Sequence, residues 1–379
     1  MERKKFGVKK IGDYLQKSLK LRKYNNLVEA LSVSKPLRKC SGITVLELRV
    51  TDDGIVTKFS IVGFMFFLLW HSLFFYCAYK AHVEDQTILR NMHNTKVQRY
   101  GDDCERIISI LYVLFAMWTV PFSMSSNTTV LKIIMNLDKE LELIGEKVDY
   151  NRDAKNASVI SVGQMLLYLI RLLSIWLILK NLNVVIPLER MYQDVYFNTL
   201  ILIVTAFYCY TLSVLRSRYR YLKKILQEIS VGKAWEYKIF VRGRLTPNMQ
   251  KAETLQDKYL CEKIRSCAKI YGLLYKGVVA VNDIYGLLLI VSMFVCVMYI
   301  ILYVFYFLEA TSAGLFHDIP LYIDFCIYVF WQTAYALCIV FLIVYFCESR
   351  SIASYGASYF KATLNLWSSP TVSVHVSAP

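Results

Sequence analysis

Long apolar runs alternate with charged segments along the whole chain. Each run is close to the roughly 20 apolar residues that a helix needs to cross a bilayer. Only two charged residues, Arg171 and Asp324, fall inside these runs. The pattern therefore predicts six membrane helices, at Phe59–Tyr79, Ile107–Met124, Val159–Leu179, Val195–Leu215, Tyr285–Leu308 and Ile323–Phe346.

The segments between the runs carry helical patterns of their own. Apolar spacing predicts a helix over residues 130–145, and residues 219–230 continue the fourth membrane helix. A hinge is expected from Gly232 to Pro247, followed by a helix from Ala252 to Val281 that leads into the fifth membrane helix. We expect an all-α membrane protein with cytoplasmic helical extensions that pack together. Three parts follow: a basic N-terminal segment (1–58), a six-span domain (59–346, with a helical loop at 216–284) and a tail (347–379).

The distribution of positive charge predicts how the chain crosses the membrane. With the N-terminus inside, 36 of the 44 Lys and Arg residues lie on the cytoplasmic side and 7 outside. Cytoplasmic loops carry such an excess, so the N-terminus is expected in the cytoplasm. Asn127 and Asn156 begin glycosylation patterns, but this orientation places both inside, so we expect neither to be glycosylated.

Composition excludes several classes of function. The net charge of +15 would suit a nucleic-acid binder, but the basic residues lie between apolar runs, where lipid head groups and topology explain them. The ten cysteines form no CxxC pair and predict neither zinc nor a disulfide framework, although Cys77 and Cys104 flank one loop and could pair. No catalytic motif occurs, and we expect no cleavable signal sequence, because the first 58 residues are polar and basic. We expect no enzyme, cofactor or metal.

Polar and aromatic side chains recur at helical spacing within four of the runs. Such residues usually face the bundle interior or a wet cavity, so we predict a pocket for a small molecule. This would explain Arg171, which would face a hydrated vestibule in the extracellular half of its helix. The candidate lining residues are Gln164, Tyr168, Arg171, Thr205, Tyr208, Ser292, Tyr299, Tyr328, Trp331, Gln332 and Tyr335.

Ordinary structural roles compete with this interpretation. Aromatic residues near the ends of membrane helices often serve only as anchors at the lipid interface. Glutamine and threonine often do no more than tie helices together. These alternatives stay open for each candidate.

The segment around the fifth run resembles one family. Residues Asn282 to Gly286, with Tyr285 as the aromatic, match an Asn-x-x-aromatic-Gly turn before a long tyrosine-rich span, as in insect gustatory receptors. The run "FWQTAYALCIVFLIVYFCES" resembles that family's sixth span, and the resemblance covers about residues 40–350. It implies a taste or internal-nutrient receptor in the plasma membrane of sensory neurons, a ligand-gated cation channel that assembles as a homo- or hetero-tetramer with other gustatory receptors. It leaves the tastant open among sugars, bitter compounds, amino acids and carbon dioxide.

The family's pore-forming seventh span is expected to be missing. After Phe346 no further apolar run and no Thr-Tyr pair occurs, whereas the family carries a Thr-Tyr-(apolar)₅-Gln-Phe signature there. We expect a truncated splice form or an incorrect gene model, or else a receptor that cannot conduct alone. The alternatives are a non-conducting membrane partner of full-length receptors and a secondary transporter. A G-protein-coupled receptor is opposed by the predicted internal N-terminus.

Overall fold

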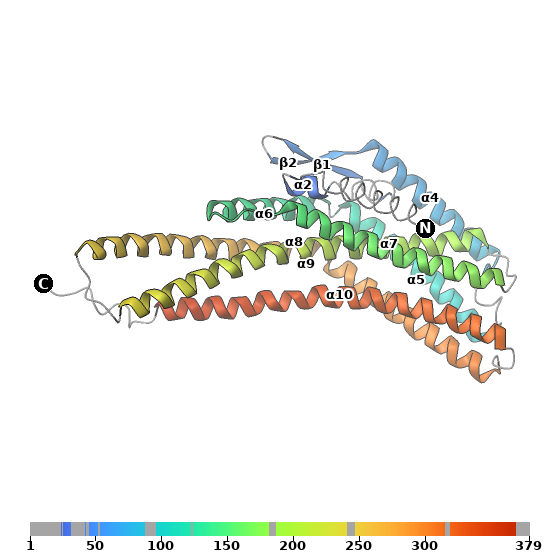
Figure 1. Ribbon diagram of the computed structural model, residues 1–379. Helices are drawn as coiled ribbons and strands as arrows, with labels where there is room; N and C mark the ends of the chain where they lie inside the picture. The colour runs from blue at the N-terminus through green and yellow to red at the C-terminus, as the bar shows by residue number, and fades with distance from the viewer. Residues whose placement is uncertain are drawn as a thin grey trace, which may run out of the picture.

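The computed structural model is an elongated bundle of helices that run side by side (Figure 1). It describes residues 24, 26–31, 42, 45–51, 54–87, 96–122, 124–181, 187–240, 247–314 and 319–368. The long helices are α4 (Ile61–Val83), α5 (Lys96–Phe122), α6 (Met124–Leu143), α7 (Tyr150–Asn181), α8 (Leu188–Phe240), α9 (Pro247–Ser312) and α10 (Ile319–Ser368). An all-α membrane protein is thereby confirmed.

Each predicted membrane helix lies within one of these helices apart from its terminal residues. Five of them, α4, α7, α8, α9 and α10, are long and apolar enough to cross a membrane. The second predicted span falls on α5, which does not meet that criterion over its described residues and ends at Phe122 rather than Met124. The count of six spans therefore stays a prediction.

Helix α8 occupies the centre of the bundle and packs against α4, α5, α6, α7, α9 and α10. The other membrane helices turn apolar side chains outward. On α7, Leu169, Leu173 and Leu177 are all exposed at four-residue spacing, which places them in one row along the helix. A row of this kind on a membrane helix is where lipid contacts are expected.

The predicted helical extensions form and pack together. Helix α6 confirms the helix expected after residue 130, and Gly145 follows its end with a φ of +97°. Helices α6, α8 and α9 contact one another, and ion pairs join Lys224 to Glu146 (3.0 Å) and Lys269 to Glu140 (2.7 Å). These contacts join the extensions of α6, α8 and α9 into one packed unit, here named the base.

Two expectations about local structure were wrong. The proposed hinge from Gly232 is helical as far as Phe240, and residues 241–246 lie outside the described part of the chain. The Asn282–Gly286 motif is no turn, because α9 runs through it without a break. The N-terminal segment contains helix α2 (Leu27–Leu31) and an antiparallel hairpin of β1 (Leu46–Thr51) and β2 (Gly54–Phe59), which was not predicted and which precedes α4.

Helix α4 begins directly after this hairpin. The Ser60 side chain accepts a hydrogen bond from the backbone N–H of Gly63 (3.2 Å), the usual way of satisfying a free N–H at a helix start. At the other end of the chain, α10 continues beyond Phe346 to Ser368. Much of the predicted tail is therefore an extension of the sixth membrane helix, and residues 369–379 lie outside the described part.

Candidate ligand-binding site

The ends of α4, α7 and α9 meet the starts of α5, α8 and α10 at one end of the bundle (Figure 1). We call it the outer end, after the prediction that this side is extracellular. Two adjoining cavities lie inside it. Helices α5, α7, α8, α9 and α10 supply their walls.

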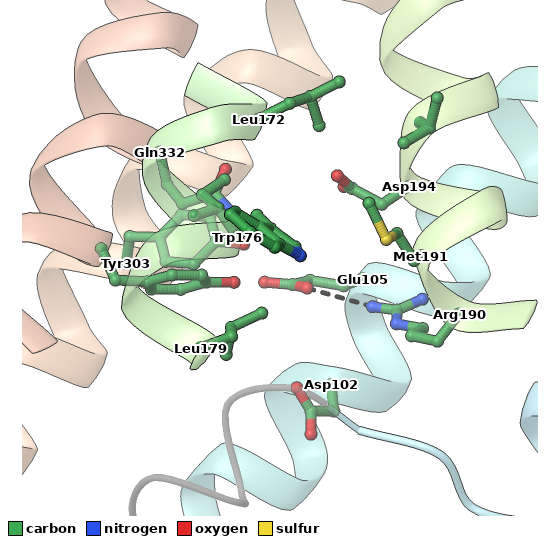
Figure 2. Close-up of a pocket in the computed structure, with 13 residues that line it drawn as sticks. Asp102, Glu105, Leu172, Trp176, Leu179, Arg190, Met191, Asp194, Tyr303 and Gln332 are labelled. Carbon is green, nitrogen blue, oxygen red and sulfur yellow. Dashed lines mark hydrogen bonds and ion pairs between the residues drawn. The ribbon is translucent and has the colours of Figure 1, made fainter. Parts of the chain in front are cut away.

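The first, here named the outer cavity, has about 40 Å³ of free space, room for roughly three waters. Figure 2 shows Trp176 and Tyr303 on one side and Glu105 and Arg190 on the other. The cavity combines aromatic surface with charged groups. Its lining consists of Asp102, Glu105, Leu172, Ile175, Trp176, Leu179, Arg190, Met191, Asp194, Val195, Tyr303, Tyr328 and Gln332.

The second, here named the deep cavity, has about 20 Å³ of free space and shares Asp194, Tyr303 and Gln332 with the outer cavity. Both together are far smaller than the roughly 300–1,000 Å³ of a typical ligand pocket. An organic ligand therefore needs these walls to move apart. The remaining lining residues of the deep cavity are Arg171, Phe197, Asn198, Ile201, Val295, Cys296, Tyr299, Tyr335, Ala336 and Ile339.

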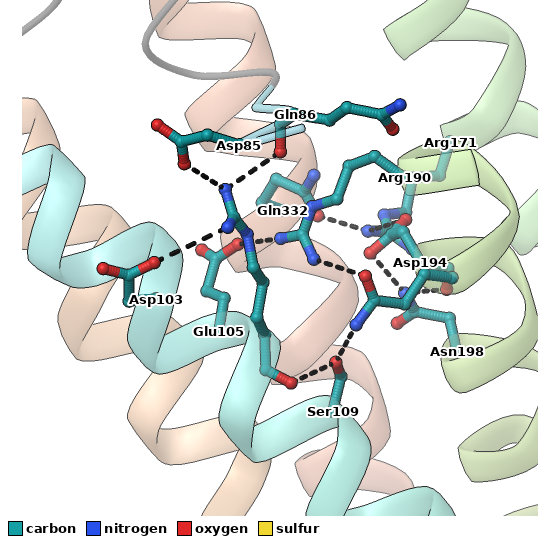
Figure 3. Close-up of polar contacts among 12 residues, drawn as sticks. Asp85, Gln86, Asp103, Glu105, Ser109, Arg171, Arg190, Asp194, Asn198 and Gln332 are labelled. Atoms are coloured by element: carbon teal, nitrogen blue, oxygen red, sulfur yellow. Dashed lines mark hydrogen bonds and ion pairs between the residues drawn. The ribbon is translucent and has the colours of Figure 1, made fainter. Parts of the chain in front are cut away.

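A chain of hydrogen bonds links α5 to α8 beside the outer cavity (Figure 3). Arg190 donates to Glu105 Oε2 (3.3 Å) and to Gln193 Oε1 (3.1 Å). Gln193 in turn donates to the Ser109 hydroxyl (2.9 Å), which donates to the carbonyl of Arg106 (2.8 Å). Arg190 is thus held by partners on two helices, and its position is fixed.

Arg171 lies between α7, α8 and α10 and is 2% exposed. It donates a short hydrogen bond to Gln332 Oε1, and its Nη2 is 3.6 Å from Asp194 Oδ2. Its guanidinium carbon lies 4.6 Å from the centre of the Tyr335 ring and 5.8 Å from that of Tyr168, distances at which a cation is attracted to an aromatic face. Nε and Nη1 have no hydrogen-bond partner. The positive charge of Arg171 is therefore stabilised by the side chains of Gln332 and Asp194 and by the two tyrosine rings.

Glu105 is 6% exposed, and its Oε1 atom has no hydrogen-bond partner. Burial raises the pKa of this carboxyl from 4.5 to about 8. The nearby Arg190 lowers the pKa, whereas the negative fields of Asp102 and Asp194 raise it. The single arginine does not fully compensate the charge.

Five predicted residues line one of the two cavities: Arg171, Tyr299, Tyr328, Gln332 and Tyr335. Tyr168 lies next to them, since its ring centre is 5.8 Å from that of Tyr335 and its hydroxyl donates to the carbonyl of Val195 (3.1 Å). The structure thus brings about half of the predicted pocket together.

The other five line neither cavity. Ser292 exchanges a hydrogen bond with the Tyr112 hydroxyl (3.0 Å), and Tyr208 one with Cys347 Sγ (2.9 Å). Trp331 packs against the ring of Phe330, while Gln164 and Thr205 are buried in the bundle. For these residues the contacts are those of helix packing.

The Asn282–Gly286 motif also lies away from both cavities. Tyr285 donates to Asn127 Oδ1 (3.1 Å), which joins α9 to α6. A Cβ on Gly286 would lie 3.4 Å from Asn282 Oδ1, one helical turn earlier. The motif therefore shapes the contact between α9 and α6. Cys77 and Cys104, which flank one loop in the sequence, are both free thiols.

The prediction missed the acidic residues of the outer cavity, together with Arg190. All of them lie outside the apolar runs. Asp102, Glu105 and Ser109 follow one another at spacings of three and four residues, which puts them on one face of α5. That spacing would have revealed them, had the helical pattern been followed beyond the apolar run.

No group of three or more His, Cys, Asp or Glu in the described part of the chain is placed to hold a metal ion.

No curated protein matches the chain significantly. The sequence profile of the 7tm Chemosensory receptor family matches residues 40–354. This match spans all the described membrane helices, and the family is one of receptors rather than enzymes. The chain is a multi-pass membrane protein that belongs to the 7tm chemosensory receptor family.

Proposed function

We propose that the protein is a gustatory-type chemoreceptor subunit, which binds a small molecule in the outer and deep cavities and gates a cation pore. The observation that carries the proposal is the pair of adjoining cavities, lined by aromatic and charged side chains, inside a chain of a chemosensory family. Ligand sites in proteins combine these features. The excess of Lys and Arg on one side supports an internal N-terminus. The resemblance to gustatory receptors supports a location in the plasma membrane of a sensory neuron.

The small size of the cavities fits a receptor that responds by changing shape. A ligand that needs more than this free space binds only a state in which the walls have separated. Binding then shifts the population toward that state. Helices α8, α9 and α10 line the cavities and continue to the other end of the bundle, where a tetrameric assembly would hold its pore.

The test uses two neighbouring leucines on α7. Leu172 lines the outer cavity, whereas Leu173 is 58% exposed on the outside of the bundle. We expect Leu172→Trp to fill the cavity and to abolish ligand-evoked currents in cells that express the receptor with its partners. Leu173→Trp adds the same volume toward lipid and should leave the response near wild type.

Surface labelling of intact cells must show equal amounts of both variants. An equal response of Leu172→Trp and Leu173→Trp to every active tastant would refute the cavity as the binding site. An epitope at the N-terminus that is accessible on intact cells would refute the orientation.

A further inference from the structure

The walls of the outer cavity carry an excess of acidic side chains. Asp102, Glu105 and Asp194 line it, against Arg190 as the basic residue. Both Nη atoms of Arg190 are engaged, with Glu105 and Gln193. Arg171, which compensates Asp194, lines the deep cavity. The walls of the outer cavity thus carry more acidic than basic side chains.

Glu105 presents a specific acceptor for that charge. Its Oε2 is used by Arg190, while Oε1 is buried and without a hydrogen-bond partner. Figure 2 shows this carboxylate in the middle of the cavity, with the Tyr303 hydroxyl directed toward it from the opposite wall. A buried acceptor without a partner is costly, so a donor that enters the cavity gains both the hydrogen bond and relief of that cost.

The aromatic side chains of the same cavity suit a cation as well. Trp176, Tyr303 and Tyr328 line it, and the ring centres of Tyr303 and Tyr328 lie 6.1 Å apart. Cations are attracted to such ring faces, and amine-binding sites combine aromatic rings with carboxylates. The carboxylates do not converge as ligands of a metal ion. Their wider placement leaves an organic cation as the better occupant.

We propose that the outer cavity selects a small protonated amine, whose ammonium group donates to Glu105 Oε1 and lies against the rings of Tyr303 and Tyr328. This inference rests on the proposed function, because it names the ligand class of the same cavity. Burial raises the pKa of Glu105 to about 8, so its carboxyl group is mostly protonated at neutral pH in the empty cavity. A bound cation would stabilise the ionised form, which Arg190 and the Tyr303 hydroxyl also favour.

The experiment measures binding to the purified full-length chain in detergent, by calorimetry and by thermal unfolding. Four probes share one isopropyl group and differ in charge: isobutylamine (cation), isobutanol (neutral), isobutyrate (anion) and valine (zwitterion). We expect saturable binding of isobutylamine, and binding of the other three that is at least about tenfold weaker. Isobutanol or isobutyrate binding as tightly as the amine, valine binding more tightly, or no binding of the amine would each overturn the proposal.

A matched pair of variants on α5 tests the acceptor. Glu105→Gln removes the charge with little change in shape, and we expect it to weaken isobutylamine binding about tenfold or more. Asp103→Asn makes the same change two residues earlier, at a half-exposed carboxylate 3.6 Å from Arg106, and should leave the affinity near wild type. Equal affinities of the two variants would overturn the role of Glu105. If Glu105→Gln does not fold, the comparison of the four probes on the wild-type chain decides alone.

The same measurements separate this inference from the proposed function. If isobutanol or isobutyrate binds and Leu172→Trp blocks it, the cavity is a ligand site but does not select a cation. A different result is that isobutylamine binds the purified chain and Leu172→Trp blocks this binding, but the currents in cells are the same with and without that substitution. In that case the amine site stands and the proposed receptor role fails.

Discussion

Arg218 donates two parallel hydrogen bonds to Asp138, from Nε to Oδ1 (2.9 Å) and from Nη2 to Oδ2 (3.1 Å). The same guanidinium bonds to Asp153 and lies near the Tyr150 ring. Arg218 is 0% exposed, and its partners come from α6 and α7. One arginine thus joins α6, α7 and α8, at a point along α8 that is 24 residues beyond Asp194 of the two cavities.

Removing this arginine should destabilise the protein strongly. Arg218→Ala leaves two buried carboxylates without their partner, and breaking a buried ion pair in this way costs about 3–5 kcal/mol. We expect a large drop in the thermal unfolding midpoint in detergent. The control is Arg220→Ala, an exposed arginine on the same helix, which should change the midpoint little. Similar midpoints for the two variants would contradict the role assigned to Arg218.

The contact between Arg171 and Asp194 predicts a compensating double substitution. Arg171→Ala leaves Asp194 near the cavity without its cation, so surface expression should fall. Arg171→Ala combined with Asp194→Asn removes both charges and should recover most of that expression. Surface labelling and ligand response are measured on the same cells. If the single variant reaches the surface normally and loses only its response, Arg171 acts in binding rather than in structure.

Glu105 predicts a pH dependence of stability. Its pKa in the folded protein is about 8, against an ordinary value of 4.5, so between these values the folded state holds a proton that the unfolded state releases. Its contribution to stability is therefore complete below about pH 4.5 and is lost as pH rises toward 8. The groups that act on it are Arg190, Asp194, Asp102 and Tyr303.

Glu105→Gln removes this titration and keeps the shape of the side chain. The stability of the variant relative to the wild type should therefore rise between pH 5 and about pH 8. The measurement is the unfolding midpoint of both proteins in detergent across that range. Parallel pH profiles of variant and wild type would show that Glu105 does not titrate there.

Gly101 is packed under the Tyr306 hydroxyl, so that an added Cβ would overlap it. Tyr306 is 0% exposed and has little room to retreat. Gly101→Ala should therefore cost about 1–3 kcal/mol and loosen α5 from α9. Gly163→Ala is the matched control, because nothing lies within 4 Å of its added Cβ; it should stabilise α7 by up to about 1 kcal/mol. An equal gain in both variants would contradict the packing.

The sequence was sufficient to find the five helices α4, α7, α8, α9 and α10 that are long and apolar enough to cross a membrane, because hydropathy reports the part of a helix that lies in lipid. It could not find where the helices end. Helix α9 continues through the Asn282–Gly286 motif, and α10 continues beyond Phe346. In both places the side chains change between apolar and polar along the chain, while the backbone stays helical. The hairpin before α4 was also missed, although the alternation of apolar and polar residues from Leu46 to Thr51 is typical of a strand.

The candidate site was predicted in part for a related reason. Arg171, Gln332 and Tyr335 were found because polar and aromatic residues stand out within an apolar run. Glu105 and Asp194 were missed because a charged residue just outside such a run looks like part of a loop. Which of the many tyrosines meet at one place depends on how the helices rotate against each other, and the sequence pattern alone does not fix that rotation.

Helix α9 joins distant parts of the protein as one continuous helix. From Tyr303 at the outer cavity to Lys258 in the base it runs without interruption for about 68 Å, at 1.5 Å per residue. A tilt of one degree about its outer end moves the far end by about 1.2 Å, calculated from that length. A ligand of only a few atoms that displaces one side chain in the cavity can therefore move the base by a distance comparable to the length of a carbon–carbon bond.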